Sequence, residues 1–138
     1  MKDSLRVGLT HDATYTVDES RVTDILGPDM KVYGTPFMIR DIERTCRALM
    51  LAHADAGEDS VGLKVDVEHL APALPGQEVK VAVRLIEVKW RRLRFEVSVR
   101  DQFEELGRGF HDRFVVEISK SRARQEKKRA QILAAKTA

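Results

Sequence analysis

The sequence predicts one α+β domain in which a single long helix lies against an antiparallel sheet of about five strands. Two patterns predict it: helical periodicity follows Thr35-Pro36, and apolar residues alternate with a period of two over most of the chain after Gly62. The same alternation covers the stretch before residue 18. A sheet with one apolar face needs one cover, and a helix of about five turns can provide it.

The first strand is expected from Arg6 to Val17, where apolar residues alternate with threonines and an aspartate. A turn-rich patch follows, with Gly27-Pro28-Asp29 and Gly34. The helix is then expected to begin with Thr35 as N-cap and to end near Ala56, before Gly57. Its apolar arc is predicted to be Met38, Ile42, Cys46 and Leu49, and its opposite side carries Arg40, Arg44 and Arg47.

Four further strands are predicted from alternation alone. Turns are expected at residues 72–76, 89–92 and 104–105, and a phase shift at Ile86 predicts a β-bulge. The predicted apolar faces are Leu63, Val65, Val67 and His69; then Val79, Val81, Val83 and Leu85; then Leu93, Phe95, Val97 and Val99; and finally Leu106, Phe110, Phe114, Val116 and Ile118.

Composition excludes several classes of protein. Hydrophobic residues make up 43% and charged residues 33% of the chain, which is typical of a globular protein with a charged surface. No apolar run approaches the roughly 18 residues of a membrane span, and the N-terminus lacks the apolar core of a secretory signal. Cys46 is the only cysteine, and the four histidines show no metal-binding spacing. A cytoplasmic protein without metal or cofactor is therefore expected.

Charge is concentrated at the C-terminus. The net charge is +2, yet residues 119–138 hold seven basic residues and one acidic residue, so the rest of the chain is net negative. We divide the chain into a domain at residues 1–120 and a basic helical tail at 121–138. The tail is either a solvated helix with Ile132 and Leu133 against the body, or a contact for phosphate or nucleic acid. No aromatic residue interrupts its charges, which speaks against single-strand nucleic-acid binding.

Four stretches of the sequence resemble the fluoroacetyl-CoA thioesterase-like branch of the hot-dog thioesterases. They are Thr35–Glu43, Val61–Gly76, Arg91–Phe95 and Gly107–Arg113, and they occur in the family's order. The resemblance implies a hot-dog fold, in which a curved antiparallel sheet wraps a long helix. It also implies a homodimer, or a tetramer of such dimers, that hydrolyses a small acyl-CoA, with coenzyme A present only as part of the substrate. Residues 27–34 are shorter than the phenylalanine-rich lid of the fluoroacetyl-specific enzyme and contain no Phe, so the acyl group stays open.

The resemblance assigns roles to individual positions. Thr35, Glu43 and His69 fall where the family has its catalytic threonine, glutamate and histidine. Glu43 would be nucleophile or general base, His69 general acid or base, and Thr35 would orient water or the carbonyl. Residues expected to bind substrate or coenzyme A are Tyr33, Gly62, Arg91, Arg92, His111 and Arg113.

The residues themselves leave alternatives for each role. Glu43 lies at the margin of the apolar arc, where it is partly desolvated, but it could instead pair with Arg47 at i+4. His69 could be a core histidine, and Thr35 an ordinary helix cap. The arginines at 91 and 92 could belong to a solvated hairpin.

His111 and Arg113 share one face of the last strand, opposite Phe110 and Phe114, and could belong to a dimer interface.

The resemblance and the alternatives together leave two functions open. The first is hydrolysis of an acyl-CoA thioester; the second is a non-catalytic hot-dog protein that binds an acyl-CoA or a partner.

Overall fold

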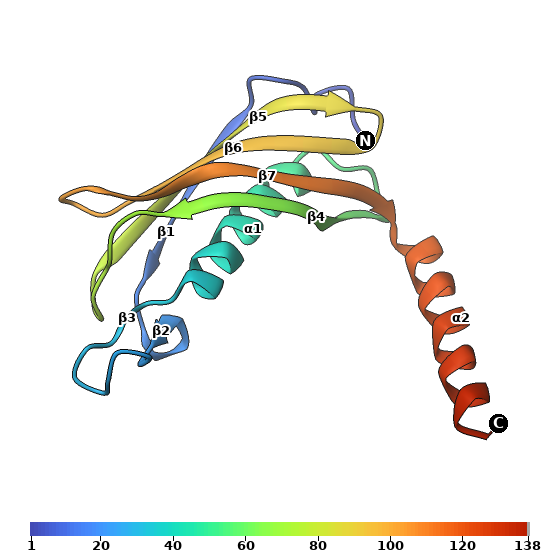
Figure 1. The fold of residues 1–138 in the computed structure, drawn as a ribbon. Helices are drawn as coiled ribbons and strands as arrows, with labels where there is room; N and C mark the ends of the chain where they lie inside the picture. Colours follow the sequence, from blue (N-terminus) through green and yellow to red (C-terminus); the bar gives the residue numbers. More distant parts are fainter. Residues whose placement is uncertain (138) are drawn as a thin grey trace.

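The structure, a computed structural model, describes residues 1–137 and consists of a curved sheet that covers one long helix (Figure 1). A second helix continues from the last strand and extends away from this body. The elements in chain order are β1 (Thr10–Thr16), the short 3-10 helix η1 (Glu19–Arg21), β2 (Val22–Thr23), β3 (Val32–Tyr33), α1 (Thr35–Leu51), β4 (Glu58–His69), β5 (Glu78–Lys89), β6 (Arg92–Arg100), β7 (Glu105–Glu117) and α2 (Ile118–Thr137).

The main sheet is antiparallel and has the order β1-β5-β6-β7-β4. The predicted α+β arrangement is confirmed. Three of the strands after α1 form a meander, while β4 pairs with the last of them and lies at the edge. The shift in register between Leu85 and Glu87 confirms the bulge predicted at Ile86.

The core lies between α1 and the concave face of the sheet. The apolar arc predicted for α1 is buried, as are the inward residues of β5 and β6. Burial of one such side chain contributes about 1.5–3 kcal/mol. Members of this core include Met38, Ile42, Cys46, Leu49, Val79, Val81, Val83, Leu85, Leu93, Phe95, Val97 and Val99.

The helix α1 ends at Leu51, five residues before the predicted end at Ala56. The chain that follows bonds the N-terminal segment in place of another helical turn. Lys2 donates its backbone N–H to the carbonyl of His53, and the terminal ammonium lies 2.8 Å from the Asp55 carboxylate. The predicted end at Ala56 was wrong because helical periodicity does not reveal contacts with the N-terminal segment, whose first residue is 54 positions from Asp55 in the chain.

The inward face of β7 also differs from the prediction. Phe110 and Phe114 are only half-buried, whereas His111 and Arg113 lie on the face toward α1 and are 0% and 4% exposed. Ile118 begins α2 and is exposed. The apolar pattern was misleading because the ion pair of Arg113 with Glu43 and a set of hydrogen bonds compensate the polar residues on the inward face.

The edge strand β4 exposes apolar side chains. Val61, Leu63 and Val65 are 49%, 51% and 40% exposed, although Val65 stands opposite the buried His111 and so shares its face of the sheet. An unpaired edge with apolar side chains is a template for pairing with another strand.

The basic tail is a helix, as predicted, but it does not pack on the body. No side chain of α2 is buried, and Ile132 and Leu133 remain 50% and 59% exposed. Ala138, the last residue of the predicted tail, lies outside the described residues. Within residues 1–137, no helix combines the length and the apolar character that crossing a membrane requires.

Candidate active site

Thr35 and His69 form a hydrogen-bonded pair at the N-terminus of α1. The Thr35 Oγ1 atom lies 2.7 Å from His69 Nδ1. Gly34 is the N-cap residue and Thr35 is the first residue of the helix, with no side-chain cap. The predicted capping role of Thr35 was therefore wrong, because its hydroxyl bonds the histidine at the end of β4.

This pair lines an open cavity of about 590 Å³ between the β2–β3 segment, the start of α1 and the chain after β4. The walls are mainly apolar, with Ile25, Val32, Phe37 and Leu70 among them. A small number of polar groups in an apolar hollow is the usual composition of a small-molecule site. A larger hollow of about 880 Å³, around Gly76 and Arg100, contains neither residue of the pair.

His69 has the environment of a neutral base. Burial lowers its pKa, because a charged imidazolium loses solvation in this position. Its Nε2 atom is buried and finds no hydrogen-bond acceptor or donor among residues 1–137. Thr35, through Nδ1, fixes the orientation of the ring.

Glu43 belongs to a second cluster, further along α1. It follows Thr35 by eight residues, which is about 12 Å along a helix axis, and it does not line the cavity. Its carboxylate lies over Gly62, where a Cβ atom would come within 2.6 Å of Glu43 Oε2. Because Gly62 has no side chain, the Glu43 carboxylate can lie directly against the backbone of β4.

Arg113 is the partner of Glu43 and not the Arg47 considered from the sequence. Its Nη1 atom lies 3.4 Å from Glu43 Oε2, and the guanidinium also donates to Ser60 Oγ at 2.7 Å and to the Ser60 carbonyl at 2.8 Å. Arg47 instead pairs with Asp59. Burial lowers the pKa of Arg113, and the carboxylate opposes that change. The side chain of Glu43 remains 40% exposed, so it can still be reached from outside the chain.

His111 completes this cluster as a neutral ring. Its Nδ1 atom lies 2.8 Å from the Lys64 carbonyl, which can only accept, so Nδ1 carries the proton. Its Nε2 then accepts from Arg113 Nη1 at 3.2 Å. Burial lowers the pKa of His111, which agrees with this neutral tautomer. Both histidine nitrogens are thus occupied, and the ring holds the arginine in place.

Of the remaining predicted residues, only Tyr33 lies in the cavity. Its ring and that of His69 form a T-shaped pair with 6.2 Å between their centroids. Arg91 and Arg92 are in neither cluster. Arg91 pairs with Glu58 and Glu117, and Arg92 donates to Asp112 at 2.6 Å.

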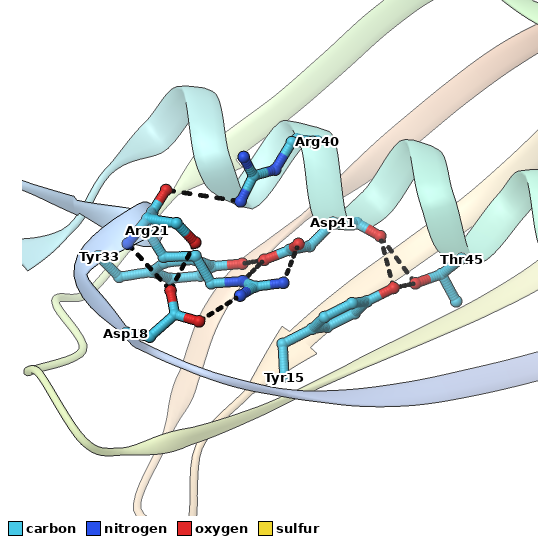
Figure 2. A network of polar contacts seen from close by, with 8 residues as sticks. Tyr15, Asp18, Arg21, Tyr33, Arg40, Asp41 and Thr45 are labelled. Atoms are coloured by element: carbon cyan, nitrogen blue, oxygen red, sulfur yellow. Dashed lines mark hydrogen bonds and ion pairs between the residues drawn. The ribbon is translucent and has the colours of Figure 1, made fainter.

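The sequence reading missed a buried polar cluster next to the cavity. Asp41 is 0% exposed and binds Arg21 and Tyr33 (Figure 2). The available signal was its position on α1, because Asp41 stands at i+3 from Met38 and at i−4 from Thr45, both buried. An aspartate at such a position requires buried partners.

The comparisons with solved structures identify a thioesterase of the hot-dog class. A crystal structure of a fluoroacetyl-CoA thioesterase superposes with a TM-score of 0.84 at 32% identity, over 91% of this chain and 98% of that one. A Thermus thermophilus member of the thioesterase superfamily superposes with a TM-score of 0.86 at 25% identity, over 94% and 97%. The predicted hot-dog fold is confirmed.

The family follows from sequence. Residues 17–119 match the family described as fluoroacetyl-CoA-specific thioesterase. The fluoroacetyl-CoA thioesterase of Streptantibioticus cattleyicolor is 34% identical, over 93% of this chain and 97% of the relative. The chain belongs to this family, and it is a hydrolase of thioester bonds.

Proposed function

We propose that the protein hydrolyses a small acyl-CoA to the free acid and coenzyme A, with Thr35 and His69 at the reacting thioester. The 2.7 Å contact between their side chains, inside an apolar cavity, carries the proposal. A neutral imidazole accepts the proton of an attacking water and later protonates the leaving thiolate. Related structures support coenzyme A thioesters as the substrate class, since mutants of the fluoroacetyl-CoA thioesterase have been solved with acetyl-CoA and with fluoroacetate and CoA.

A second copy of the chain completes this site. The edge strand β4 is unpaired and carries exposed apolar side chains at Val61, Leu63 and Val65, which a partner strand would cover. In an antiparallel pair around a two-fold axis, the first half of one β4 meets the second half of the other. Glu43 lies over the first half of β4 and His69 ends the second. If the axis is displaced so that Gly62 of one copy stands opposite the end of the other β4, the carboxylate of one copy faces the Thr35–His69 pair of the other.

Within this dimer, Glu43 acts as nucleophile or general base. As nucleophile it forms a mixed anhydride with the acyl group and releases the coenzyme A thiolate, and water then cleaves the anhydride. As general base it removes the proton of the attacking water. Arg113 holds the carboxylate at Gly62, and His111 holds Arg113.

A non-catalytic acyl-CoA-binding function is the second candidate. One observation favours it: Glu43 is ion-paired with Arg113, and no wall of the cavity in one chain includes it. In this alternative the basic helix α2, which packs on nothing, contacts the phosphates of coenzyme A or of nucleic acid.

Thiol release from a panel of short, branched, aromatic and halogenated acyl-CoAs distinguishes the two functions. Wild type, Glu43→Ala and His69→Ala are compared, with His11→Ala, an exposed histidine of β1, as control. We expect turnover of at least one substrate and a loss of about 2–4 kcal/mol of transition-state stabilisation in the two site variants only. Turnover equal in all four proteins would show that Glu43 and His69 have no part in the reaction. No turnover by wild type, with binding of the same acyl-CoAs, would favour the binding function.

A further inference from the structure

A buried carboxylate on α1 holds the segment that forms one wall of the cavity. Asp41 accepts hydrogen bonds from Arg21 Nε at 2.9 Å, from Arg21 Nη2 at 3.1 Å and from Tyr33 Oη at 2.7 Å (Figure 2). The arginine therefore binds both carboxylate oxygens, which is the most directional arrangement for this pair. Burial and the Asp41 carboxylate together raise the pKa of the Tyr33 phenol, so its hydroxyl stays protonated and keeps donating.

The arginine is held from its other side as well. Arg21 Nη1 donates to Asp18 Oδ2 at 3.1 Å, and its guanidinium lies over the Tyr15 ring at 5.0 Å from the centroid. Tyr15 in turn is hydrogen-bonded to Thr45 Oγ1 at 3.0 Å. The cluster thus joins the end of β1 and the η1 turn to one face of α1.

The part of the chain so attached is residues 18–34, which we name the flap. Its β2–β3 hairpin has two residues in each strand, too few to be stable alone. The flap exposes Ile25, Leu26 and Met30 by 85%, 65% and 54%, and Tyr33 is one of its few deeply buried side chains. Besides the backbone bond from Tyr33 N–H to the Ala73 carbonyl at 2.8 Å, the bonds to Asp41 are the main side-chain contacts that hold its position.

The flap faces His69 across the cavity. Thr23, Ile25, Val32 and Tyr33 supply the flap side of the wall. Since the Tyr33 and His69 rings form a T-shaped pair, the bond from the Tyr33 hydroxyl to Asp41 fixes a side chain that packs beside His69.

Stability alone does not account for a carboxylate at this position. An apolar residue at position 41 would extend the apolar arc of α1, and replacing a buried ion pair by apolar side chains is often neutral or stabilising. Asp41 accepts three directed hydrogen bonds, which an alkyl side chain cannot do. These bonds fix the flap in one position.

We propose that Asp41 is a positioning residue that, through Arg21 and Tyr33, sets the distance between the flap and His69 and thereby the length of acyl group the cavity accepts. The inference rests on the proposed thioesterase function. To that function it adds the residue, Asp41, that determines acyl selectivity.

The test compares Asp41→Asn and Tyr33→Phe with wild type. The first variant keeps the volume of Asp41 but removes its charge, and the second removes one hydroxyl while keeping the ring beside His69. The ratio of kcat/KM for acetyl-CoA to that for hexanoyl-CoA is measured, together with amide hydrogen exchange of residues 18–34. We expect the ratio to move about tenfold or more toward hexanoyl-CoA, and exchange in the flap to rise.

Asp59→Asn is the matched control, because Asp59 also binds an arginine through both oxygens, but that arginine, Arg47, belongs to α1 and not to the flap. It should keep the wild-type ratio and exchange. If Asp41→Asn does not fold, Tyr33→Phe decides. Variants that fold and keep the wild-type ratio overturn the inference while the thioesterase function stands. If wild type hydrolyses no acyl-CoA of the panel, the proposed function fails, and unchanged exchange in the flap then overturns the positioning role independently.

Discussion

The hydroxyl of Thr35 and the imidazole of His69 meet at 2.7 Å although 34 residues separate them in the chain. The first begins α1 and the second ends β4, so the contact exists only when the helix lies in the sheet. Replacing Thr35 by Val keeps the shape of the side chain and removes the bond. We expect kcat/KM to fall about 10²- to 10³-fold with an unchanged fold, as measured by thiol release and circular dichroism. Activity equal to wild type would show that the hydroxyl has no part in the reaction.

The activity should depend on pH through His69. Burial lowers its pKa below the ordinary value of about 6.5, so the imidazole is neutral at pH 7 and becomes protonated only in more acidic solution. As a general base it needs the neutral form. We therefore expect kcat/KM to rise with pH below about 6.5 and to be level near neutrality, in a pH–rate profile of the free enzyme. A profile that falls as pH rises through this range would instead assign His69 to the acid role.

Gly62 should be required because it seats a carboxylate. A Cβ atom there would lie 2.6 Å from Glu43 Oε2, so Gly62→Ala must displace that side chain. We expect kcat/KM to fall about 10- to 100-fold, since small misplacement of a catalytic group is costly. Lys80→Ala, at an exposed position of β5 away from this edge, is the control and should differ little from wild type. Equal activities of the two variants would contradict the role given to Glu43.

Arg113 should matter for stability far more than an exposed arginine of similar pairing. It is 4% exposed and binds Glu43, Ser60 and His111, so Arg113→Leu leaves these groups without their donor. We expect urea denaturation to show a loss of about 3–5 kcal/mol in the free energy of unfolding. For Arg47→Leu, whose ion pair is half exposed, the expected loss is about 0–1 kcal/mol. Similar losses in both variants would show that the buried contacts of Arg113 contribute no more to the free energy of unfolding than an exposed ion pair does.

Removal of α2 should leave the domain folded. None of its side chains is buried, so a chain ending at Ile118 should unfold at nearly the wild-type urea concentration. If the basic residues contact coenzyme A phosphates, KM should rise for an acyl-CoA but not for the acyl N-acetylcysteamine thioester, which lacks phosphate. An equal KM for the acyl-CoA in both proteins would exclude that contact.

The sequence by itself determined the repeating parts of this protein. Alternation placed the inward residues of β5 and β6 and the bulge after Leu85, and helical spacing placed the buried arc of α1. The periodic features depend on neighbours a few residues away, which a periodic pattern records. Thr35 and His69, which meet in the cavity, were instead assigned by the resemblance to a family.

Only the tertiary structure decided which distant groups meet. It placed β4 at the edge beside β7, turned His111 and Arg113 inward, and kept Glu43 apart from the Thr35–His69 pair. It also paired Asp41 with Arg21, and ended α1 early so that the N-terminus could bond the chain after it. A polar residue on an inward face is compatible with the fold only if a partner reaches it, and that partner is fixed by strand order and register, not by local spacing.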